Sequence, residues 1–162
     1  MVVLMSKRID YVDRMILIEL IKDSRTSMRS IALKLNLGVS TVYTRIKKLA
    51  TMGVLNGFTV EVDMVKLGMS AQAIVEIKPR PQAIGTVAQA LLNQAEVVDL
   101  YEVSGEYPLI AKVVSTDDVS LAKAIERIAS HEDIVDLRVK YIFQTRSTRT
   151  SERLVKLLQT LY

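Results

Sequence analysis

The stretch NLGVSTVYTRIKKLATMG, residues 36–53, decides how the first third of the chain folds. Its apolar residues Val42, Ile46 and Leu49 have the spacing of one face of an α-helix. The stretch begins with an Asn-Leu-Gly turn, in which asparagine tolerates a left-handed backbone and glycine can cap the next helix. It ends at Gly53, in a position where glycine commonly stops a helix. The sequence therefore predicts a tight turn followed by a helix over residues 39–52.

Two more helices are expected before this turn. Apolar residues recur at helical spacing over 9–22, where Asp10 can cap the first turn, and again over 28–35. The polar segment 23–27 separates them. Three short helices with a tight turn before the third have the geometry of a helix-turn-helix unit.

The face of the third helix opposite its apolar stripe carries hydroxyl and ammonium groups. Near a helix N-terminus, such groups suit phosphate oxygens and base edges. Arg45 lies at the edge of the buried side, where it either contacts DNA or pairs with an acid of the first helix. A solvated surface helix would also tolerate these residues. The predicted DNA-binding residues are Ser40, Thr41, Tyr43, Thr44, Arg45, Lys47, Lys48 and Arg29.

The distribution of charge along the chain supports the same interpretation. Residues 1–60 contain ten Lys/Arg against four Asp/Glu, a net charge of +6, whereas residues 61–162 contain twelve against fourteen, a net of −2. Such asymmetry favours a nucleic-acid-facing segment joined to a neutral or acidic domain, the alternative being a solvated basic surface. No apolar run is long enough for a membrane span or a signal peptide, and the chain has no cysteine, so a cytoplasmic protein is expected.

After Gly53 the periodicity changes from helical to alternating. Asn56-Gly57 is a hairpin signal, and the alternating residues after it predict either the wing of a winged helix-turn-helix or a strand that leaves the domain as a linker. Further on, strands are expected over 71–77, 97–103, 109–114 and 134–143, and helices over 83–93 and 117–130. The order βαββαβ predicts a ferredoxin-like domain and an α+β fold class.

These patterns divide the chain into a helix-turn-helix domain (1–56), a strand linker (57–68), a ferredoxin-like domain (69–145) and a C-terminal tail (146–162). The outer face of the sheet is expected to be rich in Val and Ile and so to require a partner. The tail has Leu154, Leu157, Leu158 and Leu161 on a helical stripe, which predicts a short helix docked on the dimer, the alternative being a frayed end.

Several short motifs resemble the leucine-responsive/AsnC (feast/famine) transcription regulators over about residues 9–156. The motifs are Asp13-x-x-Ile16-Leu17-x-x-Leu20, Ile31-Ala32, Val42-x-x-Arg45-Ile46-x-x-Leu49, Gly53-Val54-x-x-Gly57-Phe58 and Val103-Ser104-Gly105-Glu106-Tyr107. The resemblance implies homodimers, often assembled into octamers, that bind pseudo-palindromic double-stranded DNA. It also implies a second domain that senses a small molecule, usually an amino acid, and mediates oligomerisation.

The sensing domain departs from the family pattern. Pro108 stands where an acidic residue is usual, and Arg138 and Lys140 stand where hydroxyl residues are common on the last strand. The resemblance places effector-binding residues at Gly105, Glu106, Tyr107, Arg138 and Lys140. Two added positive charges predict a ligand with net negative charge, such as an acidic amino acid or another carboxylate, or else loss of effector binding. Alternatively, both side chains form salt bridges with Glu102, Glu106 or Asp136.

Other functions fit the sequence less well than regulation of transcription. Some haem-pathway decarboxylases have a similar architecture and use histidines, but this chain has the single histidine His131, in a loop beside Glu132 and Asp133. With one histidine and no cysteine, no metal site, no catalytic residue and no cofactor is expected. An architectural DNA-binding protein without an effector would use the same basic helix, so the sequence leaves that alternative open.

Overall fold

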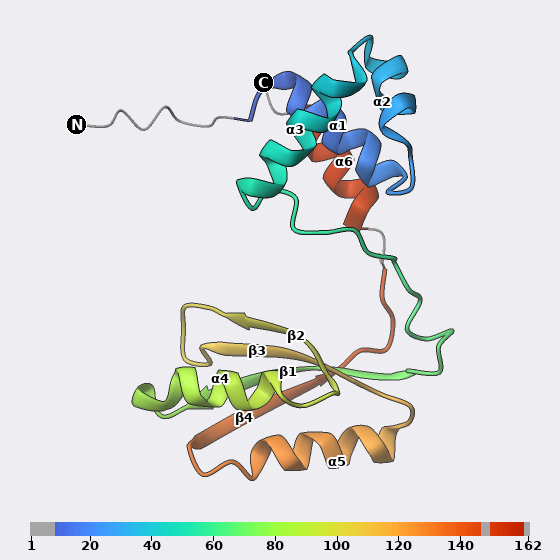
Figure 1. Cartoon of the computed structure of the whole chain (residues 1–162). Coiled ribbons are helices and arrows are strands. Elements are labelled where there is room, and N and C mark those ends of the chain that lie inside the picture. Colours follow the sequence, from blue (N-terminus) through green and yellow to red (C-terminus); the bar gives the residue numbers. More distant parts are fainter. Residues whose placement is uncertain (1–8, 147–149, 161–162) are drawn as a thin grey trace, which may run out of the picture. The chain divides into compact units, whose positions relative to one another are not determined.

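The computed structural model describes residues 9–146 and 150–160, which form two compact units (Figure 1). One unit comprises the described residues up to Glu61 together with the C-terminal helix α6, and the other comprises Val62–Arg146. The division between them falls inside the segment 57–68 that was expected to be a linker. No helix in these described ranges is both long and apolar enough to cross a membrane.

The first unit is built around three helices, α1 (Tyr11–Lys22), α2 (Met28–Leu35) and α3 (Val39–Thr51). Their shared core consists of the buried residues Ile16, Leu20, Ile31, Ala32 and Val42. Burial of aliphatic side chains contributes about 1.5–3 kcal/mol each, which offsets the poor stability of such short helices in isolation. The three predicted helices are confirmed, as is the helix-turn-helix arrangement.

The local signals at the helix ends act as the sequence predicts. Asp10 caps α1 by accepting the Asp13 N–H, and Asn36 adopts a left-handed backbone with φ of 53° between α2 and α3. Gly38 is the N-cap residue of α3. Gly53 follows α3 with φ of 67°, a conformation that favours glycine.

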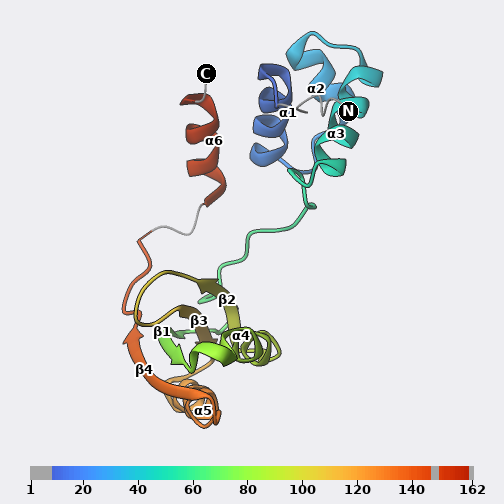
Figure 2. The same cartoon turned by 90° about the vertical axis from the view of Figure 1, so that its left-hand side faces the viewer.

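The helix α6 (Thr150–Thr160) packs against the back of α1, on the side away from α2 and α3 (Figure 2). Ile18 lies on that side and is only 2% exposed, and it lines a small space together with Leu158. The tail is therefore helical, but its buried side differs from the expected leucine stripe. Leu154 and Leu157 are exposed, whereas Leu158 shares the half-buried side with residues 151 and 155; Leu161 lies outside the described residues.

The expected wing or linker strand after α3 is absent from the single chain. Between α3 and β1 (Ala71–Pro79), the described residues form no strand, so the hairpin predicted at Asn56-Gly57 is wrong. Phe58, Val60 and Val62 alternate as the sequence suggested, but all are exposed. A strand requires a hydrogen-bonding neighbour, and a single copy of this chain offers none here.

The second unit has the predicted βαββαβ order and forms a four-stranded antiparallel sheet with strand order β2-β3-β1-β4. The remaining elements are a 3₁₀ turn at Pro81–Ala83, α4 (Ile84–Leu92), β2 (Val97–Glu102), β3 (Leu109–Ser115), α5 (Asp118–Ala129) and β4 (Ile134–Tyr141). The inward residues of β1 and β3 form one buried cluster with apolar residues of α4 and α5. Both helices therefore cover the same face of the sheet, which confirms the ferredoxin-like fold.

The uncovered face of this sheet is mixed rather than rich in Val and Ile, because Ile74, Ile110 and Val114 share it with polar and charged residues. On β1 the outward positions include Gln72, Glu76 and Lys78, whereas Ala73, Val75 and Ile77 point into the core. On β4 the outward residues at positions 136, 138 and 140 are all charged. Because side chains alternate along a strand, most Val and Ile residues of these strands are already used in the core.

Candidate nucleic-acid interface

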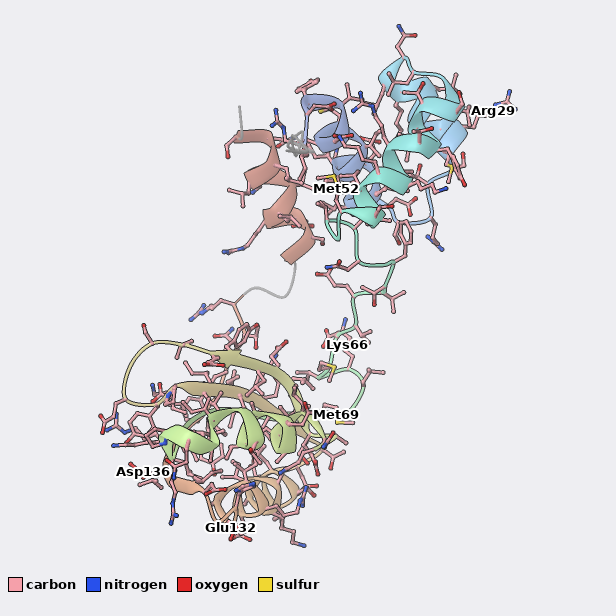
Figure 3. All side chains as sticks on the ribbon, turned by 60° about the vertical axis from the view of Figure 1, so that its left-hand side comes forward. Arg29, Met52, Lys66, Met69, Glu132 and Asp136 are labelled. Carbon is pink, nitrogen blue, oxygen red and sulfur yellow. The ribbon has the colours of Figure 1, made fainter. Side chains whose placement is uncertain are left out.

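Helix α3 buries one face and exposes the opposite face to solvent. Val42 and Leu49 are fully buried against the neighbouring helices, which fixes the rotation of α3 about its axis. Of the α3 residues that the sequence singled out, all but Arg45 and Lys48 are exposed, namely Ser40, Thr41, Tyr43, Thr44 and Lys47. Arg29 is exposed on α2 and projects into solvent (Figure 3). These side chains offer hydroxyl, phenol, ammonium and guanidinium donors to a ligand.

An open hollow of about 420 Å³ lies beside the N-terminal half of α3. Its lining residues are Asp10, Ser40, Thr41, Thr44, Arg45 and Lys48. The N-cap residue Gly38 brings no side chain to the first-turn amides, so the positive end of the helix dipole is not shielded by a capping oxygen. The Thr44 hydroxyl donates to the Ser40 carbonyl at 2.9 Å, which leaves its oxygen lone pairs to accept a further bond.

The carboxylate of Asp13 lies buried between α1 and α3. It has no exposed surface, and it accepts hydrogen bonds from Arg45 Nη1 at 2.8 Å and from Lys48 Nζ at 2.6 Å. It also accepts the Asp10 backbone N–H at 3.1 Å, which completes the capping box of α1. Breaking a buried ion pair by removing one partner costs about 3–5 kcal/mol. The two cations therefore fasten α3 to α1.

Arg45 and Lys48 consequently lie elsewhere than the other predicted DNA-binding residues. The same Arg45 nitrogen, Nη1, also donates to Asp10 Oδ2 at 2.5 Å, so the predicted pairing of Arg45 with an acid of the first helix is present. Lys48 was expected on the exposed face, but its ammonium group points at Asp13. Side-chain exposure falls to 27% for Arg45 and 29% for Lys48. Both still line the hollow beside α3.

A second acidic residue of α1 holds α2 in a similar way. Glu19 is nearly buried and accepts a hydrogen bond from Lys34 at 2.6 Å and another from Lys22 at 3.3 Å. The hydrogen bond from Lys34, outweighing the effect of burial, lowers the pKa of Glu19 below its ordinary value. Helix α1 thus binds one cation of α2 and two of α3 through carboxylates on its inner side.

Sequence reasoning offered an acid of the first helix as a partner of Arg45 but did not identify Asp13 or Glu19 as the residues that hold the helices together. Asp13 falls on the same side of α1 as Ile16 and Leu20, as its spacing in the helix shows. A lone acid on an apolar face must find positive partners, since an unpaired buried charge is very costly. The signal was therefore present in the sequence, which indicated Arg45 as a partner but placed Lys48 on the exposed face.

The predicted effector residues meet at one end of the sheet in the second unit. Gly105 has φ of 125°, so the turn after β2 requires glycine. Beyond it, Tyr107 is buried and donates its hydroxyl to Asp136 Oδ2 at 2.5 Å, a partner that the sequence did not indicate (Asp136, Figure 3). Glu106 accepts a hydrogen bond from Lys78 at 2.9 Å, which lowers its pKa below the ordinary value.

Arg138 and Lys140 differ in their surroundings. The guanidinium of Arg138 lies over the Tyr107 ring, 4.2 Å from its centroid, and 4.0 Å from Glu106. Lys140 forms an ion pair with Glu76 on the neighbouring strand, rather than with any of the three acids that the sequence suggested. Arg138 therefore belongs to the cluster around the turn, whereas the charge of Lys140 is balanced on β1.

The remaining candidates for a site were His131 and possible metal-binding groups. His131 Nδ1 accepts the backbone N–H of Asp133 at 3.2 Å, which is a local turn contact. Among residues 9–146 and 150–160, no group of three or more His, Cys, Asp or Glu residues could hold a metal ion.

Comparison with known proteins assigns the two units separately. Residues 9–56 match the model of a winged helix-turn-helix DNA-binding domain, and residues 72–152 match the model of the Lrp/AsnC ligand-binding domain. The first match contains α1, α2 and α3, and the second contains the whole sheet with α4 and α5.

Whole proteins and solved structures resemble the chain over most of its length. An uncharacterized HTH-type transcriptional regulator of Pyrococcus furiosus is 46% identical over 114 residues, which are 69% of this chain and 77% of that protein. The HTH-type transcriptional regulator FL11 of Pyrococcus abyssi is 30% identical over 142 residues, 88% of this chain and 94% of the other. A transcriptional regulator of Neisseria meningitidis, solved as a complex with L-Met, has the same fold with a TM-score of 0.81, 19% identity, and coverage of 89% of this chain and 96% of that one.

Acid should destabilise the first unit through Asp13. Burial opposes ionisation of Asp13, but hydrogen bonds from Lys48, the Asp10 backbone and Arg45 outweigh it and hold the pKa below its ordinary value of 3.8. A carboxylate with a lowered pKa stabilises the folded state above the unfolded pKa of about 3.9, and loses this effect as the pH falls through the folded value. The protection factors of amide hydrogen exchange in the first unit, which correct for the intrinsic pH dependence of exchange, should therefore fall below about pH 4.

The Asp13→Asn variant should have a lower free energy of unfolding at neutral pH, and that free energy should change less as the pH falls. Asp23→Asn makes the same charge change at an exposed residue of the same unit and should keep the wild-type profile. Equal acid sensitivity in all three proteins would contradict the role given to Asp13.

Proposed function

Because the chain belongs to the Lrp/AsnC family of DNA-binding transcriptional regulators, we propose that it reads double-stranded DNA with the exposed face of α3. The observation that supports this assignment is the clustering of Ser40, Thr41, Tyr43, Thr44 and Lys47 on one solvent-facing side of the helix. Phosphate contacts from Lys47 and Arg29 would position the helix, and the hydroxyl groups would contact base edges. A cytoplasmic location follows from this function, as the sequence predicts.

The regulator acts as a homodimer on pseudo-palindromic sites. The linker supports this proposal, because its apolar residues Phe58, Val60 and Val62 are 59%, 77% and 49% exposed in the single chain. An alternating segment with unpaired backbone groups is completed by pairing with another strand. A second copy supplies an identical strand, and two-fold symmetry places two α3 helices on two half-sites.

The second unit binds a small amino-acid-like carboxylate near the turn at residues 105–107. The regulator of Neisseria meningitidis with the same fold was solved with L-Met, which supports an amino acid as the class of effector. In this chain Arg138 is the cation closest to the Tyr107 ring, and its ion pair with Glu106 is long and solvent-exposed. Exposed pairs contribute little to stability, so a ligand carboxylate can replace Glu106 as the partner of Arg138.

Lys47→Gln should weaken binding to every DNA sequence, because Lys47 is exposed and its proposed role is to bind phosphate. The slope of log K against log salt should become shallower by about 0.9 for each phosphate that the variant no longer neutralises. Replacing Thr44 by Val should instead change preference among sequences, with about 1–3 kcal/mol for each base edge that is no longer bound. Gel shifts across salt concentrations measure both effects.

Lys123→Gln, an equal charge change on α5 of the second unit, is the control for this experiment. Normal DNA binding by Lys47→Gln at all salt concentrations would refute the assignment of α3. Lys48→Gln is less suitable than Lys47→Gln for testing phosphate binding, because it also removes a partner of the buried Asp13.

Val60→Asp should dissociate the dimer, since it places a charge in the proposed strand pairing. Light scattering of the wild-type protein should give the mass of a dimer, or of an octamer built from dimers, whereas the variant should shift toward monomer. Val119→Asp is the matched control, because Val119 is also exposed, at 66%, but lies on α5. If Val60→Asp has the mass of the wild-type protein, the dimer interface does not include the strand around Val60.

Arg138→Thr should abolish the preference of the protein for acidic ligands. Thermal-shift screening against neutral, basic and acidic amino acids should show the largest stabilisation by a compound with net negative charge. Arg127→Thr removes another ion-paired arginine of the second unit and should leave the ligand profile unchanged. Tight binding of lysine that survives Arg138→Thr would show that Arg138 does not select the ligand.

A further inference from the structure

The cations beside the reading face of α3 are balanced by carboxylates of the same unit. Arg45 and Lys48 contribute two positive charges, and Asp10 and Asp13 contribute two negative ones within 2.8 Å of them. Asp13 is buried, but the Asp10 side chain is 48% exposed and lines the hollow next to Ser40, Thr41 and Thr44. DNA that approaches Arg45 therefore also approaches the exposed carboxylate of Asp10.

The guanidinium of Arg45 is held by one of its nitrogens only. Both carboxylates accept from Nη1, and this uses the two hydrogens of that nitrogen. In the described part of the chain, Nε and Nη2 have no protein partner. These nitrogens present parallel N–H donors, the arrangement with which arginine binds two acceptors at once.

An arginine that is paired with two carboxylates binds a charged phosphate less readily than a neutral base edge. A phosphate that approached Arg45 would also approach Asp10, and the two anions would repel each other. The O6 and N7 atoms of guanine are neutral acceptors, so they can take two of the three remaining N–H groups, one on Nε and one on Nη2, while Asp10 and Asp13 keep their own bonds. The carboxylates also fix the side chain, so less rotamer freedom is lost on binding.

We propose that Asp10 is a specificity-determining residue that makes Arg45 a reader of guanine and prevents it from binding phosphate. The proposal rests on the assignment of α3 as the DNA-reading helix. Asp10 lowers the affinity for DNA of arbitrary sequence, where binding is almost wholly electrostatic, and leaves the base contact of Arg45 intact. The ratio of specific to non-specific affinity rises as a result.

Asp10→Asn tests this role with little change to the fold. Asp10 also caps α1 by accepting the Asp13 N–H through Oδ1 at 2.9 Å, and asparagine is an equally good cap. The variant therefore removes the charge at Oδ2 and keeps the capping oxygen. Asp117→Asn is the matched control, because Asp117 caps α5 in the second unit through Ser120 N–H at 2.8 Å. Asp10→Ser gives a second capping residue without charge.

The assay compares the full-length variants on two probes, a duplex obtained by in vitro selection with the wild-type protein and a duplex of mixed sequence. Asp10→Asn and Asp10→Ser should bind the mixed duplex about eight-fold more tightly for each additional phosphate neutralised at about 0.1 M salt, with a slope steeper by about 0.9. The wild-type protein should lose about 5- to 150-fold in affinity when one guanine of a single half-site is replaced, and the Asp10 variants should lose less.

Arg45→Gln is the last variant, and because it also removes a partner of the buried Asp13, circular dichroism must first show that it is folded. It should abolish the guanine preference, and adding Asp10→Asn to it should produce no further increase in affinity for the mixed duplex. Wild-type affinity of Asp10→Asn for the mixed duplex, or a guanine preference that survives Arg45→Gln, would overturn the inference. If Lys47→Gln also leaves binding unchanged, the assignment of α3 itself has failed; if Lys47→Gln weakens binding, only the role of Asp10 has failed.

Discussion

The buried carboxylate of Asp13 is the constraint on which the DNA-binding unit depends. A charge without contact to water persists only when cations compensate it, and Arg45 and Lys48 reach it from one side of α3. The capping box at Asp10 places that carboxylate at a defined height on α1. Helix α3 is therefore held at two points one turn apart, in addition to its apolar contacts, and the rotation that exposes Tyr43 and Lys47 follows from this attachment.

The second unit uses its charges in the opposite manner. The ion pairs Lys78–Glu106 and Arg138–Glu106 lie on the surface of the uncovered sheet face, where water competes with each bond. Such pairs exchange partners at little cost, whereas the pair at Asp13 does not. Within one chain, then, buried ionic contacts fix the geometry of a rigid recognition element, and exposed ones keep a sensing surface adaptable. The buried Tyr107 hydroxyl bonded to Asp136 gives that surface one fixed point.

Much of the fold was predictable from the sequence because it is encoded locally. The turn at Asn36, the cap at Asp10 and the strand that begins at Ala71 each depend on neighbouring residues, and each was predicted correctly. The errors concern features that need a partner distant in the sequence. A linker strand around Val60 requires another chain, the polarity of the sheet face depends on which side α4 and α5 cover, and Lys48 turns inward because Asp13 lies beneath it. The exposed residues of the candidate site were thus predicted, as was an acidic partner for Arg45, whereas the burial of Asp13 and its bond to Lys48 were not.

The packing of α6 on α1 also affects the order in which the protein matures. The DNA-binding unit is discontinuous, since its last helix follows the entire second unit in the sequence. On the ribosome, the back of α1 around Ile18 therefore stays uncovered until α6 has left the exit tunnel, long after α1, α2 and α3 have been synthesised. A nascent chain thus carries an incomplete DNA-binding unit until the whole second unit and α6 have been synthesised.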